Sequence, residues 1–304
     1  MSSVLLRALS LITVILLGYL LKRKNIVTLN DFPAISTMIV RITLPGAIIS
    51  SFSKLDVQPS MIILTFLGIF CNALMVFLGY SIRWRRSKAD RAFHMLNYAG
   101  YNIGSFALPY VQSFLGPAGF LGVCLFDAGN AVMCTGANYF LASSVVDDTK
   151  HGLKFVLKTF FSLVTVDVYI AMTILSLLHI RLPSFILSVA DVTGAANPFL
   201  AMFILGVAFE LRLSRSQVKK ITAILLLRYG MSALFAVCFY LFLPFSEEIR
   251  QGLAVVVFAP LSSLCTIFTA RIKGDVNLSG TLSSISIVVS IFLMTGLMLW
   301  MQAG

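Results

Sequence analysis

Two apolar stretches of the chain carry a proline beside small polar side chains, a combination that could bind a small molecule inside a membrane. Residues 92–115 contain Pro109, and residues 251–271 contain Pro260. Proline removes one backbone hydrogen bond and clashes with the carbonyl four residues earlier, so polar groups freed near it must meet protein, water or a ligand. Two interrupted spans in corresponding halves predict a substrate site. Beside the prolines, the side chains and small residues expected to line it are Tyr101, Asn102, Gly104, Ser262 and Ser263.

The ends of a broken helix indicate the charge of the ligand. Helix N-terminal ends attract anions, whereas C-terminal ends and unwound carbonyls suit cations. A carboxylate would therefore find donors without a lysine, and the amides of Asn102 and Asn130 could serve either sign. The alternative for both asparagines is structural, because polar groups in membranes often hydrogen-bond neighbouring helices.

Four ionisable residues lie inside apolar stretches, where each costs roughly 2.5 to 3.5 kcal/mol on insertion scales and requires a partner or a task. Arg41 and Arg228 could neutralise an anionic substrate or hold a buried carboxylate. Asp127 and Asp167 could carry a coupling proton or pair with these arginines, and both interpretations stay open. The histidines have no ligand spacing, so no metal site is predicted.

Composition places the chain in a bilayer. Apolar residues make up 59% and charged residues 12% of its 304 residues, against roughly 25% charged in a soluble domain. The net charge of +11 does not indicate nucleic-acid binding, because the basic residues lie between apolar spans and act as topology signals. No hydrolase, zinc-protease or nucleotide-binding motif is present, so an enzyme is not expected.

The apolar stretches predict ten membrane spans, each near the length of about 20 residues that a bilayer needs. They lie near residues 3–21, 32–52, 59–82, 92–115, 118–143, 154–180, 184–211, 219–243, 251–271 and 277–301. Most of the 23 lysine and arginine residues fall in the loops after the odd-numbered spans. Under the positive-inside rule we therefore expect a multi-pass protein of the cell membrane (inner or plasma membrane) with both termini outside.

Three pairs of prolines indicate that the two halves are related. The pairs, each separated by about half of the chain, are Pro33 and Pro183, Pro45 and Pro198, and Pro109 and Pro260. Five spans per copy is an odd number, so the second copy must insert in the opposite orientation. The predicted fold is all-α, with ten transmembrane helices in two inverted five-helix repeats, residues 1–145 and 146–304.

The motifs along the chain resemble those of the auxin efflux carrier family, which includes plant PIN auxin transporters and bacterial carriers of organic acids. In the fourth span, Asn102, Gly104 and Pro109 match the family's N-x-G-x-x-G-x-P pattern, with Ala107 where its third small residue stands. Other family motifs are matched in order by Leu44 and Pro45, by Asp127, Gly129 and Asn130, by residues 198–206, and by Ala259 and Pro260.

The resemblance implies that helices four and nine are broken and cross, with substrate bound beside the crossing. It also implies that one bundle moves against another in an elevator-like alternating access. The expected function is secondary active transport, of efflux-carrier type, of a small organic anion, most simply a carboxylate. A proton or Na⁺ would be the coupling ion, and no other cofactor is expected.

Several alternatives stay open at this point. They are a cation-coupled symporter or antiporter of bile-acid or sodium/proton type, an uncoupled channel, a membrane sensor, and an intramembrane protease built on serine or aspartate. The expected partners are the anionic substrate and the lipid bilayer, with no nucleic acid. No dimerisation motif stands out beyond the Gly100 and Gly104 pair, which we assign to internal packing, so a homodimer is left open.

Overall fold

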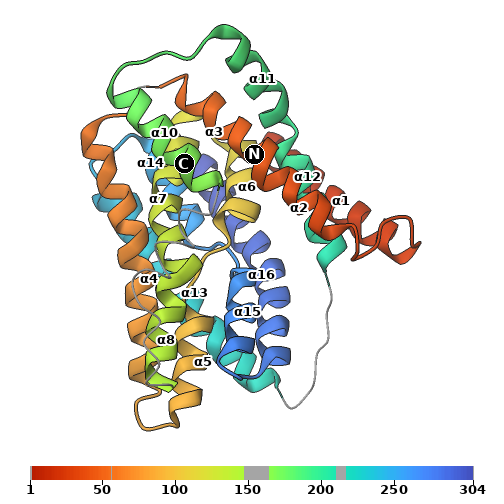
Figure 1. The fold of residues 1–304 in the computed structure, drawn as a ribbon, viewed down its shortest axis with the longest axis vertical. Helices are drawn as coiled ribbons and strands as arrows, with labels where there is room; N and C mark the ends of the chain where they lie inside the picture. The colour runs from red at the N-terminus through yellow and green to blue at the C-terminus, as the bar shows by residue number, and fades with distance from the viewer. Residues whose placement is uncertain (1, 56, 147–163, 210–216, 304) are drawn as a thin grey trace.

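The computed structural model describes residues 2–55, 57–146, 164–209 and 217–303, and the regular elements in these ranges are helices (Figure 1). Within these described ranges, seven helical stretches are long and apolar enough to cross a membrane. They are Leu5–Arg23, Phe32–Phe52, Pro59–Ile82, Pro117–Val146, Ser184–Ala208, Val218–Phe242 and Val276–Met301. Of the other three expected spans, two contain a helix break and the third is described only from Val164 onward. The first ten residues expected for that sixth span, 154–163, lie outside the described residues.

The N-terminal half contains the α-helices α1 to α8 and four short segments of π-helix or 3-10 helix, labelled η1 to η4. The bounds are α1 Ser2–Arg23, α2 Phe32–Met38, η1 Ile39–Thr43, α3 Leu44–Phe52, η2 Pro59–Ile62, α4 Ile63–Ile82, α5 Lys88–Tyr98, η3 Ile103–Ala107, α6 Leu108–Phe114, α7 Pro117–Val132, η4 Met133–Ala137 and α8 Asn138–Val146. Of the four turns, η1, η3 and η4 are π-helical and η2 is a 3-10 turn.

The C-terminal half contains α10 to α16. The bounds are α10 Val164–Leu177, α11 Ser184–Ala195, α12 Asn197–Ala208, α13 Val218–Phe242, α14 Glu247–Val256, α15 Ser263–Arg271 and α16 Val276–Ala303. Large apolar side chains such as Phe66, Phe185 and Phe242 are exposed on the outer surface. An outer surface of this kind suits lipid rather than water, as the sequence predicts.

The helices pack into two bundles, each built from both halves of the chain. Bundle A comprises α1 to α3 and α10 to α12, and bundle B comprises α4 to α8 and α13 to α16. In Figure 1 the elongated bundle B occupies the left and lower part of the molecule, and α1, α2 and α12 of bundle A run along its upper right side. Helices α6 and α7 of bundle B contact bundle A.

Glycines allow the closest helix contacts inside each bundle. A Cβ added to Gly129 of α7 would lie 1.8 Å from the Thr65 carbonyl oxygen of α4, and one added to Gly206 of α12 would lie 1.9 Å from the Ile15 carbonyl oxygen of α1. No side chain fits at such distances, so the backbones of these helix pairs are in direct contact. Each bundle is therefore tightly packed within itself.

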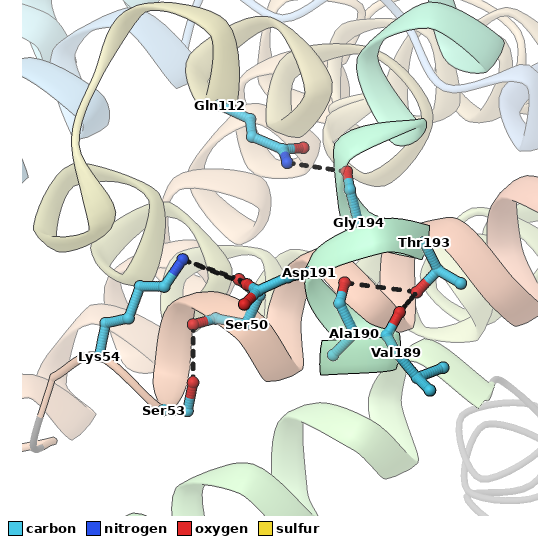
Figure 2. Close-up of polar contacts among 9 residues, drawn as sticks. All are labelled: Ser50, Ser53, Lys54, Gln112, Val189, Ala190, Asp191, Thr193 and Gly194. Carbon is cyan, nitrogen blue, oxygen red and sulfur yellow. Dashed lines mark hydrogen bonds and ion pairs between the residues drawn. The ribbon is translucent and has the colours of Figure 1, made fainter. Parts of the chain in front are cut away.

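Side-chain hydrogen bonds join the two bundles. Gln112 of α6 donates to the carbonyl of Gly194 at 3.0 Å, and its own side-chain oxygen accepts from Asn197 of α12 at 3.2 Å. Arg7 of α1 donates to the carbonyl of Ser113 at 2.8 Å. Figure 2 shows Gln112 reaching Gly194, close to a separate cluster inside bundle A in which Asp191 binds Ser50 and Lys54.

The prediction of a helix break at Pro109 is wrong in position, because the helix is interrupted before that residue. The non-helical residues are 99–102, between α5 and η3, and Pro109 lies in the first turn of α6. Helix α6 continues directly from η3, and the wider π-helical turn before Pro109 accommodates the proline without breaking the helix. Pro45 in the first turn of α3 is placed in the same way, and a π-helical turn precedes each of the two prolines.

Candidate functional site

The two interrupted helices meet backbone to backbone at their breaks. Tyr101 and Leu261 form an isolated antiparallel bridge. The Asn102 N–H donates to the carbonyl of Pro260 at 2.9 Å, and the Ser262 N–H donates to the carbonyl of Gly100 at 3.3 Å. The second break, residues 257–262, contains Pro260 itself. The predicted crossing of these two segments is therefore present, with Pro260 in the second break and Pro109 outside the first.

Two asparagines hold the backbone of the first break. Asn72 of α4 accepts from the Gly100 N–H at 2.9 Å. Asn130 of α7 accepts from the Tyr101 N–H at 3.3 Å and donates to the Tyr101 carbonyl at 3.0 Å. Asn130 is buried and also bonds Asn72 and Asp127. Its amide is fully engaged by protein, which is the structural role that the sequence left open.

Two serines of α16 hold the backbone of the second break. Ser286 accepts from the Leu261 N–H at 2.9 Å, and Ser290 donates to the Phe258 carbonyl at 2.6 Å. These serines lie four residues apart and so on one face of the helix. The unwound backbone at both breaks is thus largely satisfied by neighbouring side chains instead of being free for a ligand.

Arg228 of α13 lies at the centre of the crossing and is fully buried. Its guanidinium donates to the carbonyls of both breaks, namely those of Tyr98, Gly100 (3.0 Å), Ala259 (3.1 Å) and Pro260 (3.4 Å). It also lies 4.9 Å from the centre of the Tyr101 ring, within cation–π range. One cation therefore stabilises the negative C-terminal ends of α5 and α14 together.

Asp127 of α7 is bound by neutral donors. Its Oδ1 accepts from the Asn130 amide at 2.8 Å, and its Oδ2 accepts from the Tyr169 hydroxyl of α10 at 2.8 Å. Among the described residues it forms no ion pair, and Arg228 binds carbonyls instead. Asp127 is therefore not the partner of a buried arginine, and its role in coupling stays a prediction.

Asn102 is the last residue of the first break, Gly104 follows in η3, and both are partly exposed. The Asn102 side chain makes no hydrogen bond within the described part of the chain, although its backbone N–H is bound to Pro260. A Cβ added to Gly104 would lie 3.6 Å from Asp127 Oδ2 and 3.5 Å from Leu44. The Asn102 amide, which has no hydrogen-bond partner among the described residues, thus lies two residues before Gly104, which faces the Asp127 carboxylate.

The remaining predicted site residues have different environments. Ser262 is buried and accepts from the Leu264 N–H at 3.4 Å, so it caps α15, whereas Ser263 is exposed. Tyr101 is buried in the crossing with its ring beneath Arg228. Pro109 is buried in α6, away from the break.

Arg41 and Asp167 do not contribute to the crossing. Both are exposed on bundle A, and neither has a hydrogen bond or ion pair within the described ranges. Arg41 lies at the edge of a shallow groove between α3 and α11 that is lined mainly by apolar residues. Neither residue pairs with Asp127 or Arg228, so of the four ionisable residues inside the predicted spans only Asp127 and Arg228 lie at the crossing.

Sequence reasoning missed Asn72, Tyr169, Ser286 and Ser290. Asn72 is a lone amide in the very apolar helix α4, a type of residue that often forms an interhelical hydrogen bond in membranes. Ser286 and Ser290 have the spacing of one helix face. Tyr169 carried no signal that distinguishes it from other tyrosines, because its partner is distant in sequence.

Two family models match the chain, one in each half. The family model described as membrane transport protein matches residues 3–151, and the sodium bile acid symporter family model matches residues 199–304. A search of curated proteins found no significant match.

A multi-pass helical bundle matched by these two families is a membrane transporter and not an enzyme. Within that class the chain belongs to the auxin efflux carrier family of membrane transport proteins.

Proposed function

We propose that the protein is a secondary active carrier that moves a small organic anion, most simply a carboxylate, by alternating access with proton coupling. The observation that supports this most directly is the crossing of two broken helices, where Arg228 occupies the carbonyls of both breaks while the Asn102 amide has no described partner. Secondary transporters commonly bind substrate at such breaks.

The chemistry of the crossing favours an anion over a cation. A cation would need the unwound carbonyls, but Arg228 already binds those of both breaks. The buried guanidinium also carries a full positive charge. A carboxylate beside Asn102 would receive an amide hydrogen bond within this positive field.

Asp127 is the residue that we assign to coupling. Gly104 faces its Oδ2, so an anion bound beside Asn102 lies near this carboxylate. Two like charges at close range repel each other, and the repulsion disappears when Asp127 takes up a proton. Proton binding and anion binding therefore favour each other, and substrate affinity falls as the pH rises.

The two bundles and the two breaks support an inverted repeat of residues 1–145 and 146–304. Each half contributes helices to both bundles and one broken helix to the crossing. In Figure 1 the start of α1 and the end of α16 both lie in the upper half, while the basic loop between α4 and α5 lies at the lower end. Both termini would then be outside the cell membrane, with bundle B moving against bundle A.

Counterflow of labelled malate, malonate and indole-type acids into proteoliposomes tests the proposal. We expect saturable exchange, accumulation driven by a pH gradient, and higher affinity at acidic pH. Asp127→Asn should bind the anion with an affinity that no longer changes with pH, and Asn102→Ala should lower flux without impairing insertion. Accumulation driven by a Na⁺ gradient would show that sodium, not the proton, is the coupling ion. Current without coupling would indicate a channel, and binding without flux would indicate a sensor.

A further inference from the structure

One hydrogen bond between the two bundles has an ionisable acceptor. The hydroxyl of Tyr169, in α10 of bundle A, donates to Asp127 Oδ2, in α7 of bundle B, at 2.8 Å, and both side chains are buried. The contacts made by Arg7 and Gln112 across the same interface involve carbonyl and amide oxygens. Among these contacts, only the strength of the Tyr169 bond depends on the protonation of its acceptor.

Among the groups around Asp127, the Tyr169 hydroxyl is the hydrogen-bond partner that comes from bundle A. On its own helix and the turn that follows, Cys124, Asn130 and Cys134 are close to it. From η3 it faces Gly104. Three other helices packed on α7 bring only neutral groups: α3 places Leu44 beside Gly104, α4 places Asn72 against Asn130, and the residues of α6 are uncharged. The carboxylate of Glu248, in α14, lies at the start of α7, far from Asp127.

We propose that Tyr169 is a positioning residue that responds to the proton on Asp127 and thereby sets how firmly the two bundles are joined. While Asp127 is ionised, the Tyr169 bond is charge-assisted. When a proton binds Oδ2, the carboxylate becomes a neutral acid and Tyr169 keeps only a neutral hydrogen bond, either as donor or as acceptor of the new O–H. Charge-assisted hydrogen bonds are roughly twice as strong as neutral ones, so proton binding loosens the interface.

This inference rests on the proposed proton coupling at Asp127 and adds a consequence for the order of steps. The carrier without a proton is held by the strong bond, whereas the carrier loaded with proton and anion is released to move. Bundle movement is therefore favoured in the loaded state, which limits movement of the carrier without its proton. Tyr169 would act on turnover directly, and on anion affinity only through the ease with which Asp127 takes up its proton.

Tyr169→Phe tests this role, because it removes the hydroxyl and keeps the ring. At saturating substrate we expect wild-type exchange to be about five-fold slower at alkaline than at acidic pH, the size of the difference between a charged and a neutral hydrogen bond. Tyr169→Phe should exchange at alkaline pH nearly as fast as at acidic pH, while its anion affinity still falls as the pH rises, over a higher pH range because ionised Asp127 has lost a donor. Tyr110→Phe is the matched control, since the Tyr110 hydroxyl is bound to Thr295 at 2.8 Å inside bundle B. Its pH profile should equal that of the wild type.

A wild-type pH profile in Tyr169→Phe, or an equal loss of rate at every pH, would overturn the role of Tyr169 and leave the proposed function intact. Conversely, an affinity that still depends on pH in Asp127→Asn would remove the proposed coupling itself. A second test needs no variant and measures the rate of backbone amide hydrogen exchange in α10 of the wild-type protein, corrected for the intrinsic effect of pH. This rate should rise on acidification, and an unchanged rate would contradict the inference.

Discussion

Arg228 shows at the scale of one residue how a charge can be retained inside a membrane protein. A buried cation is costly unless its charge and donors are compensated. Here the compensation comes from the carbonyls released by two helix breaks and from the face of the Tyr101 ring. The breaks and the arginine therefore require each other, since the guanidinium needs these acceptors and the carbonyls of Tyr98 and Ala259 have it as their donor.

Arg228→Met should strongly destabilise the protein. Each buried carbonyl left without a donor costs about 1 to 3 kcal/mol, so we expect a total loss of about 3 kcal/mol or more. Thermal unfolding of the purified protein in detergent measures it. Arg181→Met is the control, because Arg181 is exposed and should leave the melting temperature nearly unchanged. Equal melting temperatures for the Arg228→Met variant and the wild type would show that the breaks do not depend on the guanidinium.

At the scale of elements, the first break depends on glycine as well as on its neighbours. Gly100 has a φ of +81°, a conformation that side chains rarely adopt. A Cβ at this position would also lie 3.0 Å from the sulfur of Cys265, on the opposite broken helix. The pair Gly100 and Gly104 was assigned to helix packing, but Gly100 is needed for backbone conformation, and Gly104 has room for a methyl group.

Gly100→Ala should therefore be destabilising by about 1 to 2 kcal/mol, the cost of a left-handed residue with a Cβ. Gly104→Ala should change the melting temperature little, because its Cβ would make only ordinary contacts with Leu44 and Asp127. Both variants are compared by thermal unfolding in one detergent. A larger loss for Gly104→Ala than for Gly100→Ala would contradict this assignment.

At the scale of the whole molecule, the interface between the bundles differs from the packing inside them. Direct backbone contacts at glycine, such as those of Gly129 and Gly206, lie within bundle A or bundle B. The hydrogen bonds described between the bundles involve side chains of α1, α6, α7, α10 and α12. Side-chain contacts can be exchanged at lower cost than interlocked backbones, so the interface is the place where movement is expected.

Cross-linking the bundles should stop transport. In a background with the five cysteines replaced by serine, Gln112→Cys with Asn197→Cys joins bundle B to bundle A. A cleavable thiol cross-linker should abolish exchange, and reduction should restore it. Ser50→Cys with Asp191→Cys lies within bundle A (Figure 2) and should keep transport after cross-linking. Full exchange by the cross-linked Gln112 pair would rule out movement at this interface.

The predicted span boundaries agree closely with the helices because bilayer thickness and side-chain hydrophobicity act locally along the chain. The spans expected at 32–52, 59–82 and 219–243 differ by at most one residue from the helical stretches observed. The break in the fourth span lies before the position that the sequence predicts, because proline is not its cause. Gly100 and the external donors Asn72 and Asn130 determine its position instead.

The sequence by itself determined that this chain is a helical membrane protein, because apolar length and charge placement are properties of continuous segments. Only the tertiary structure decided which buried groups meet. Arg228 could have paired with Asp127, yet it binds four carbonyls, and Asp127 binds Asn130 and Tyr169. Such partners come from separate helices, and their choice depends on how the bundles pack rather than on spacing along the chain.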